Sequence, residues 1–385
     1  MDRFFSSIIV LCYNGLEETT RPCLESIIKN TPAGSYELIV VDNASVDGTA
    51  EYLKAFAAKH ENVVLQLNDI NKGYAGGNND GIKLAQGQYI VLLNNDTLVP
   101  KEWLERLLKI LKEQPSVGLV GPVTNSAGNE QRIELEGLNE KNYEEIAAAY
   151  IERQKGVWFN TEKLGFFCVA MRHTLPDKIG YLDEKFGIGM FEDDDYCVRA
   201  KKVGYTLAVV EDCFVYHKGS VSFKKLATGD YIEIFNRNRN YFYEKHGMLW
   251  TYADIALGIW TKLQADIMKV TKQGNHVASE RIEGRLDDMS NALVQLREFE
   301  KRQAVIGGQT FIETQLAEKQ RDLMEISDWA TSIKKDNERL AAEFLSARAE
   351  LMAMSDWAAN MKRDIDEMSR SRCYRFFRFL QRRGI

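Results

Sequence analysis

The sequence lacks the features that mark secreted, membrane-spanning and nucleic-acid-binding proteins. Its six cysteines form no CxxC pair and no regular framework, which favours reduced thiols in a cytosol over a disulfide scaffold. Because no run of about 18 apolar residues occurs, we expect no segment that spans a bilayer. The net charge of −6 argues against nucleic acid as a partner. The first residues pass directly into a strand-like run, so no signal peptide is expected.

The 385 residues exceed one average domain, and their character changes near residue 270. Before that point, short runs of β-branched and apolar residues alternate with helical patterns. The expected strands cover residues 7–12, 37–41, 63–67 and 89–93, and the expected helices cover about 17–30, 48–59, 78–86 and 101–113. This alternation predicts an α/β fold with a mostly parallel sheet flanked by helices. In such sheets, ligands bind beyond the carboxyl ends of the strands.

After about residue 275, proline is absent and the pattern is that of a long helix. Apolar residues recur at spacings of three and four from Ile312 to Met368, which predicts a coiled coil, and Gly307-Gly308 is expected to break it. Asn337 falls at a core position, where a buried Asn favours a parallel dimer, so we expect a homodimer or small homo-oligomer. The expected units are an α/β domain at 1–250, a helical linker at 251–275, the coiled coil at 276–370 and a basic aromatic tail at 371–385.

The tail at 371–385 interleaves arginines with aromatic residues and contains no acid. As a helix it would place arginine near lipid headgroups and phenylalanine near acyl chains, which is typical of an anchor at a membrane surface. The alternative is a basic end that closes the coil or packs on another subunit. From this tail we expect a cytoplasmic protein that lies at the inner face of the cell membrane. Nucleic acid is not an expected partner, because a short basic patch is a weak signal.

Two acidic segments and one histidine are candidates for chemistry. Asp96 ends an expected buried strand, where one carboxylate suits a hard divalent cation, although a turn-capping Asp is an equal alternative. The run 192–195 holds four acids, and crowded carboxylates raise one another's pKa, so that one can act as a base. A solvated acidic loop is the alternative, but the flanking Phe191 and Tyr196 favour an ordered helix start. His217 follows an apolar strand and is a candidate imidazole ligand, although a lone His is more often structural.

Polar residues follow the other expected strands as well. Asp42 closes the second strand and can accept the imide N–H of uracil or thymine, or a ribose hydroxyl. A helix N-cap is an equal alternative for this residue. The glycine-rich segment 71–81 would let the backbone approach a phosphate or sugar closely, although many ordinary loops have the same composition.

Taken in order, these motifs resemble those of family 2 glycosyltransferases with the GT-A fold, over about residues 5–245. The matching segments are 7–14, 41–49, 71–81, 93–96, 179–184, the acids 192–195 with Arg199, and Tyr216-His217. The chain is most similar to bacterial members that build surface polysaccharides such as O-antigen, including rhamnosyltransferase-like enzymes.

The resemblance implies how a nucleotide-sugar donor, such as a UDP- or dTDP-sugar, would be bound. Asp42 would contact the base, with Tyr13 nearby. Asn78, Asp80 and Asn95 would belong to the donor pocket.

The resemblance also implies the chemistry. Asp96 would hold manganese or magnesium against the diphosphate, with His217 as a second ligand. Asp193 would be the general base of an inverting single displacement onto a hydroxyl of a growing polysaccharide or lipid-linked glycan, and Glu192 would orient the acceptor or sugar. Asn94 departs from the pattern, because many relatives carry there the first Asp of an Asp-x-Asp motif. The metal site would therefore have one fewer charged ligand.

Two rival functions follow from the same residues. A nucleotidyltransferase would need a basic, glycine-rich triphosphate loop near the N-terminus, but residues 13–18 are not basic. A non-catalytic sugar-binding scaffold would depend on the coiled coil for its assembly. The presence of Asp96, Asp193 and His217 argues against this second function.

Overall fold

The computed structural model describes residues 6–133, 135–219 and 228–247. The predicted coiled coil, its break at Gly307-Gly308 and the basic tail lie outside these residues, as does the expected linker at 251–275. The oligomer and membrane-surface predictions that depend on them therefore stay predictions.

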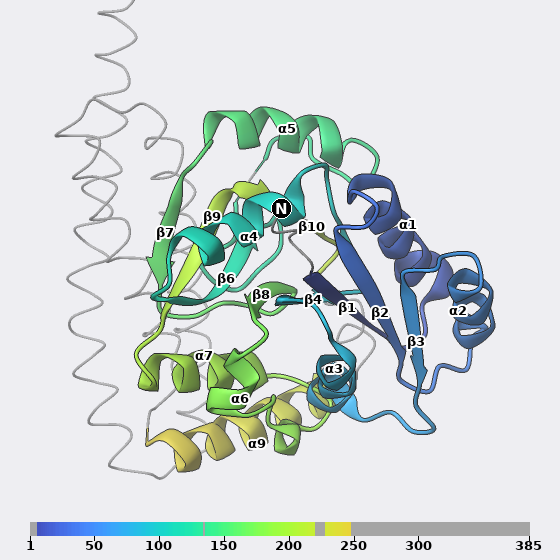
Figure 1. Ribbon diagram of the computed structural model, residues 1–385. Helices are drawn as coiled ribbons and strands as arrows, with labels where there is room; N and C mark the ends of the chain where they lie inside the picture. Colours follow the sequence, from blue (N-terminus) through green and yellow to red (C-terminus); the bar gives the residue numbers. More distant parts are fainter. Residues whose placement is uncertain (1–5, 134, 220–227, 248–385) are drawn as a thin grey trace, which may run out of the picture. The chain divides into compact units, whose positions relative to one another are not determined.

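A mostly parallel sheet forms the centre of the α/β domain (Figure 1), with the strand order β3-β2-β1-β4-β8-β6-β9-β7. The strands are β1 Ser6–Cys12, β2 Tyr36–Asp42, β3 Val63–Leu67, β4 Tyr89–Asn94, β6 Val117–Val123, β7 Trp158–Thr161, β8 Cys168–Arg172 and β9 Thr206–Phe214. Strands β3, β2, β1 and β4 are parallel, β8 is antiparallel to β4 and β6, and β7 is antiparallel to β9. A second, two-stranded sheet pairs β5 Thr97–Leu98 with β10 Tyr216–His217.

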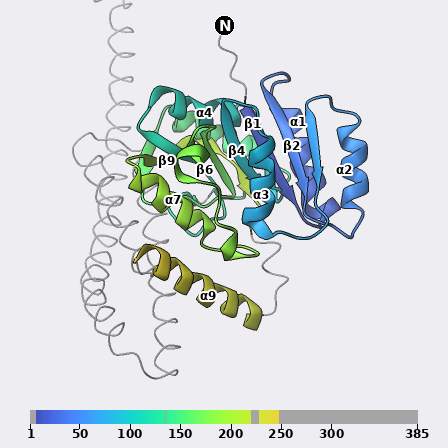
Figure 2. The ribbon, with the colours of Figure 1, turned by 60° about the horizontal axis from the view of Figure 1, so that its bottom comes forward.

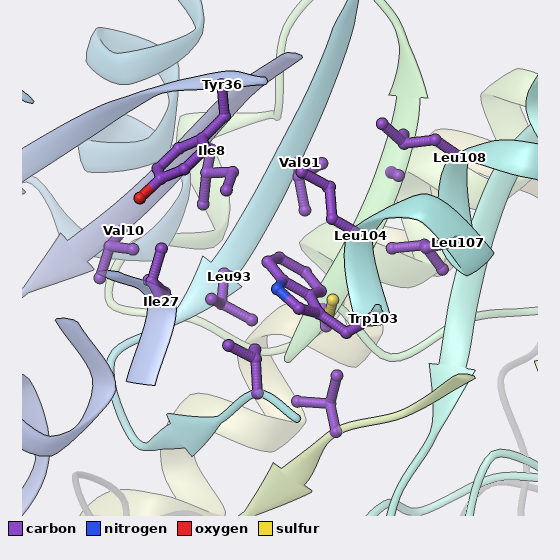
Figure 3. Close-up of a cluster of buried hydrophobic side chains, with 14 of the residues drawn as sticks. Ile8, Val10, Ile27, Tyr36, Val91, Leu93, Trp103, Leu104, Leu107 and Leu108 are labelled. Atoms are coloured by element: carbon purple, nitrogen blue, oxygen red, sulfur yellow. The ribbon is translucent and has the colours of Figure 1, made fainter. Parts of the chain in front are cut away.

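Helices cover both faces of the sheet, as the sequence predicted (Figure 2). They are α1 Arg21–Asn30, α2 Thr49–Ala57, α3 Gly73–Leu84, α4 Trp103–Glu113, α5 Tyr143–Arg153, α6 Leu175–Ile179, α7 Glu192–Lys202 and α9 Thr228–His246, with short helical turns η1 Leu16–Thr20 and η2 Glu184–Phe186. Because side chains alternate along a strand, Ile8 and Val10 pack with α1, α2 and α4, whereas Ile9 packs with α3 and α7. Figure 3 shows the first of these two cores around the fully buried Trp103.

The glycine-rich segment 71–81 differs from the expected loop, because helix α3 already begins at Gly73. Its glycines serve close packing of this helix on β1. A Cβ added at Gly77 would collide with the side chain of Leu11, and one added at Gly81 would collide with Ile9. Because these glycines have no side chain, α3 packs closely against β1. The segment therefore forms the start of a helix and not an open loop for a phosphate.

The cysteines of the described residues lie deep in the domain. They are Cys12, Cys23, Cys168, Cys197 and Cys213, each free and buried. Burial raises the pKa of all five thiols, because the low-polarity interior disfavours the thiolate. None of the described helices is long and apolar enough to cross a bilayer.

Candidate active site

The site is built where the strand order reverses between β1 and β4. Strand β1 pairs with β2 on one side and with β4 on the other, so their carboxyl ends share one edge of the sheet. In this register Cys12 lies opposite Asp42, and Leu11 lies opposite Asn94. This is the edge at which open α/β sheets bind ligands.

Asp96 and His217 come together although 120 residues separate them in the chain. Strands β5 and β10 pair so that His217 lies opposite Thr97, and its Nε2 is 3.3 Å from Asp96 Oδ1. The ring Nδ1 lies 2.7 Å from the carbonyl oxygen of Ser126. Because a carbonyl only accepts hydrogen bonds, Nδ1 carries a proton and donates it. In the neutral imidazole, Nε2 therefore presents a lone pair toward Asp96.

This pair suits a divalent cation. Asp96 is only 8% exposed, and its Oδ1 is buried without a hydrogen bond. An oxygen and a nitrogen that both present lone pairs repel each other unless a proton or cation lies between them. Within the described ranges no group of three or more His, Cys, Asp or Glu side chains could hold a metal, so Asp96 and His217 would supply two ligands. Magnesium-type sites of this kind complete their coordination with substrate phosphates and water.

The two acids predicted for catalysis open helix α7. Glu192 is 6% exposed, and burial, followed by the charge of Asp193, raises the pKa of Glu192 well above its ordinary value. Burial and then the charge of Asp194 raise the pKa of Asp193 to about 7, whereas the ammonium group of Lys163 opposes the shift. Asp193 Oδ1 also accepts a hydrogen bond of 2.9 Å from the backbone N–H of Asp194. One acid is thus held protonated, and its neighbour titrates near neutral pH.

The hydroxyl of Tyr74 is influenced by the acids of α7 and by Asp96. Tyr74 projects from the start of α3 and donates a 2.6 Å hydrogen bond to the carbonyl of Phe166. Its pKa is raised well above the ordinary value by burial, then by the charges of Glu192 and Asp193, and more weakly by Asp96. Charges at the start of α7 and in the turn after β4 therefore both raise the pKa of Tyr74.

The segment before β8 links the same two regions by direct contact. The backbone N–H of Leu164 donates to Cys197 Sγ of α7 at 3.4 Å. Three residues later, the Phe167 ring stacks on His217 with ring centres 5.2 Å apart. One short stretch of chain therefore touches both α7 and the imidazole of the predicted metal pair.

Asp42 ends β2 opposite Cys12, the residue that precedes Tyr13. Its Oδ2 accepts a hydrogen bond from the backbone N–H of Ser45 at 3.1 Å, whereas its Oδ1 is buried without a partner. Tyr13 is 45% exposed. The turn after β1 is tied to the turn after β2, because the Asn14 N–H donates to Ser45 Oγ at 2.7 Å. The free carboxylate oxygen of Asp42 can accept an N–H or O–H group from a ligand.

The other predicted donor-pocket residues are engaged by the fold. Asn78 is buried, and its amide donates to a backbone carbonyl one turn earlier in α3. Asp80 forms an ion pair with Lys72 at 2.7 Å. Asn95 donates to Thr20 Oγ1 at 2.9 Å, which ties the turn after β4 to η1. These contacts give all three residues structural roles, and any donor contact by them stays a prediction.

Sequence reasoning missed the function of the last acid in the run. Asp195 is fully buried, and its two oxygens contact the cations of Arg199 at 2.7 Å and Lys245 at 2.6 Å and the imidazole of His246 at 2.8 Å. The spacing from Asp195 to Arg199 is four residues, which is a recognisable signal for a helix ion pair. No such signal pointed to Lys245 or His246 of α9. Asp195 therefore secures α9 to α7.

The known proteins that are similar to this chain include glycosyltransferases. Residues 7–175 match the family described as Glycosyl transferase family 2. Similar curated proteins include poly(ribitol-phosphate) beta-glucosyltransferase of Bacillus spizizenii, 37% identical over 112 residues, which are 29% of this chain and 18% of that protein. Glycosyltransferase AglE of Haloferax volcanii is 34% identical over 103 residues, which are 26% of this chain and 34% of that protein. The similarity thus spans about a fifth to a third of these relatives.

Among solved structures, GalNAc-T7 with UDP, GalNAc and Mn²⁺ is similar with a TM-score of 0.46 and 15% identity, over 56% of this chain and 44% of that one. The helix-flanked, mostly parallel sheet described above is GT-A-like, as the sequence predicted. The match over residues 7–175 shows that this part of the chain is similar to glycosyltransferase family 2.

Proposed function

We propose that this protein is an inverting glycosyltransferase that moves a sugar from a nucleoside diphosphate to a hydroxyl of a glycan. One observation carries the proposal: Asp42, Asp96 and Glu192 each hold a buried carboxylate oxygen without a hydrogen bond. Folded proteins rarely leave such oxygens unpaired, except where a ligand or cation completes them. Asp42 ends β2 and Asp96 follows β4 at one sheet edge, and the charges of Glu192 and Asp96 both raise the pKa of Tyr74.

The donor base is expected at Asp42. Its unpaired Oδ1 would accept the imide N–H of uracil or thymine, which favours a UDP- or dTDP-sugar. The exposed ring of Tyr13 stands at the adjacent strand end, where a planar base can stack on it. Both groups lie at the ends of neighbouring strands, so the base would bind on one side of the switch point between β1 and β4.

Asp96 and His217 are the residues that would hold manganese or magnesium. When bound, such a cation would stabilise negative charge on the departing diphosphate. The orientation of the His217 ring is already set, because its protonated Nδ1 is bonded to the Ser126 carbonyl and the Phe167 ring stacks on the imidazole. Asn94 leaves this site with one carboxylate, so we expect moderate metal affinity.

Asp193 is the proposed general base. In its ionised form it would take the proton of the acceptor hydroxyl, whose oxygen bonds to the anomeric carbon as the bond to the diphosphate oxygen breaks. Attack from the face opposite the diphosphate inverts the anomeric centre. The raised pKa of Glu192 keeps this neighbour protonated, so it would donate a hydrogen bond to a hydroxyl of the acceptor or sugar.

The wider role is proposed from the sequence pattern. We propose a growing polysaccharide or lipid-linked glycan as acceptor, as in rhamnosyltransferase-like enzymes of surface polysaccharides. The segment 276–370 would assemble a homodimer or small homo-oligomer, and the tail at 371–385 would hold it at the inner membrane surface.

A donor screen tests the proposal. The full-length protein is incubated with UDP-glucose, UDP-N-acetylglucosamine, dTDP-rhamnose or GDP-mannose, with and without Mn²⁺, and release of nucleoside diphosphate is measured. We expect release from a uridine or thymidine donor that increases with Mn²⁺. If no donor is cleaved and no nucleotide raises the melting temperature, the proposed function is wrong.

A further inference from the structure

One side chain of α9 binds the turn that leads into the catalytic acids. The Asn238 amide Nδ2 donates to the carbonyls of Phe186 and Gly189, both at 2.8 Å, and of Met190 at 3.1 Å. Asn238 is 1% exposed. The Arg237 guanidinium donates to Asn238 Oδ1 at 3.1 Å and so directs the amide N–H groups toward the turn. Because the amide has two hydrogens for three carbonyls, one hydrogen is shared.

The turn itself has an unfavourable backbone. Gly187, Gly189, Met190 and Phe191 all have positive φ angles, of 72°, 151°, 77° and 75°. A residue other than glycine in the left-handed region costs on the order of 1–3 kcal/mol and persists only where its surroundings hold it. Here two such residues stand directly before Glu192, so the direction in which α7 starts depends on external contacts.

Helix α9 supplies these contacts beside α7 (Figure 2). The rings of Phe235 and Phe242 lie 5.2 Å and 5.9 Å from the Phe191 ring, measured between centres. The contacts of Lys245 and His246 with Asp195, described above, hold the far end of the helix. Asn238 lies between these anchors, where its amide meets the turn.

We propose that Asn238 is a positioning residue for sugar transfer: by bonding the carbonyls of the 186–190 turn, it sets the direction in which Glu192 and Asp193 enter the site. This inference rests on the proposed function. A base must reach the acceptor hydroxyl within hydrogen-bond distance, and a misplacement of about 1 Å can cost about a hundredfold in rate. Asn238 lies outside residues 7–175, over which the chain matches its family.

Two substitutions separate hydrogen bonding from packing. Asn238→Ala removes the amide, whereas Asn238→Asp keeps its shape but replaces the N–H donors with an oxygen that faces three carbonyls. If donation matters, kcat for nucleoside diphosphate release falls at least about tenfold in both, with Asp as impaired as Ala or more so. A pure packing role predicts the reverse order. Asn240→Ala, an exposed asparagine of the same helix, is the matched control and should keep the wild-type kcat.

The donor KM, measured beside kcat, adds a second criterion. The donor KM should stay within about twofold, because Asp42 and Asp96 lie on elements that the turn does not hold. If Asn238→Ala does not fold, Arg237→Ala serves instead. This variant releases Asn238 Oδ1 and removes the 3.5 Å hydrogen bond from Arg237 to the Phe186 carbonyl, but it keeps the Asn238 amide, so we expect a smaller loss of kcat at unchanged donor KM. Wild-type kcat in both Asn238 variants would overturn the inference.

Hydrogen exchange measures how firmly the 186–190 turn is held, and it needs no substrate. In Asn238→Ala, the peptide covering 186–195 should exchange faster, while the peptide covering β2 should be unchanged. Unchanged exchange at 186–195 would also overturn the inference. If the wild type cleaves no donor, the proposed function fails, and the exchange result still decides whether Asn238 holds the turn.

Discussion

The transfer rate should follow the ionisation of Asp193. Burial and the charge of Asp194 raise the pKa of this carboxyl group to about 7, and a general base works only when ionised. The rate at saturating donor should therefore rise with pH, reaching about half of its plateau at pH 7 and about a tenth at pH 6. An aspartate with the ordinary pKa near 4 would give almost no loss at pH 6.

Two variants of α7 separate the base from its surroundings. Asp193→Asn keeps the shape and the hydrogen bond from the Asp194 N–H, so donor binding should persist while transfer falls about 10²- to 10⁴-fold. Asp194→Asn is the matched control, because it removes a charge that raises the pKa of Asp193 but leaves the base. It should keep the plateau rate and shift the half-maximal pH below 7. Initial rates of nucleoside diphosphate release from pH 5 to 8 measure both effects.

The same group makes a prediction about stability. A carboxyl group whose pKa is raised by folding contributes stability below its unfolded pKa, near 4, and loses that contribution as pH rises through about 7. Asp193→Asn should therefore stabilise the domain by on the order of 1–3 kcal/mol at pH 8 and by much less at pH 4. Urea denaturation at both pH values measures this difference. A flat wild-type rate between pH 5 and 8, or wild-type turnover by Asp193→Asn, would refute the reasoning.

Three further predictions concern the metal pair, the helix packing and the assembly. Asp96→Asn should lose the rise in melting temperature that Mn²⁺ with UDP gives the wild type, whereas the exposed Asp177→Asn should keep it; an equal rise in both would contradict the metal assignment. Gly77→Ala should destabilise the fold by about 1–3 kcal/mol in urea denaturation, because its Cβ would overlap a neighbouring strand residue. Gly128→Ala, whose added Cβ meets nothing within 4 Å, should have little effect, and equal losses would contradict the packing argument. Removal of residues 276–385 should leave a monomer by light scattering, and a fragment that still dimerises would show that the coil is not the assembly element.

The sequence predicted the first four strands well, because buried parallel strands are continuous apolar runs with distinct ends, but it did not predict β6, β7 and β8. Strands β1 to β4 lie within a residue of their predicted bounds. The predicted helix at 17–30 divides into η1 and α1, and the helix α3 begins five residues early. Its glycines suggested a loop, since a pattern of glycine does not reveal whether a helix packs closely on a strand. Only the partner side chains, such as Leu11 beside Gly77, make that distinction.

The sequence indicated part of the arrangement that the structure shows. The family resemblance paired Asp96 with His217, whereas the two-residue strands β5 and β10 that join them are too short for a sequence pattern. The acidic run indicated an ordered helix start. It did not reveal that Asp195 contacts Lys245 and His246 of α9, because such contacts depend on how a distant helix docks. The amide of Asn238 was hidden for the same reason.

The burial of the described cysteines has a practical consequence for experiments. A reagent such as Ellman's disulfide attacks the thiolate, and the raised pKa of these thiols makes that form scarce while the domain is closed. Cys12 and Cys213 lie in strands, so their reaction requires the sheet to open. The rate at which these two thiols are labelled therefore measures how often the native domain opens. A nucleotide sugar that binds the closed form would lower the labelling rate by the same factor by which it lowers the population of the open form. Binding of a donor can thus be detected even when no acceptor is known.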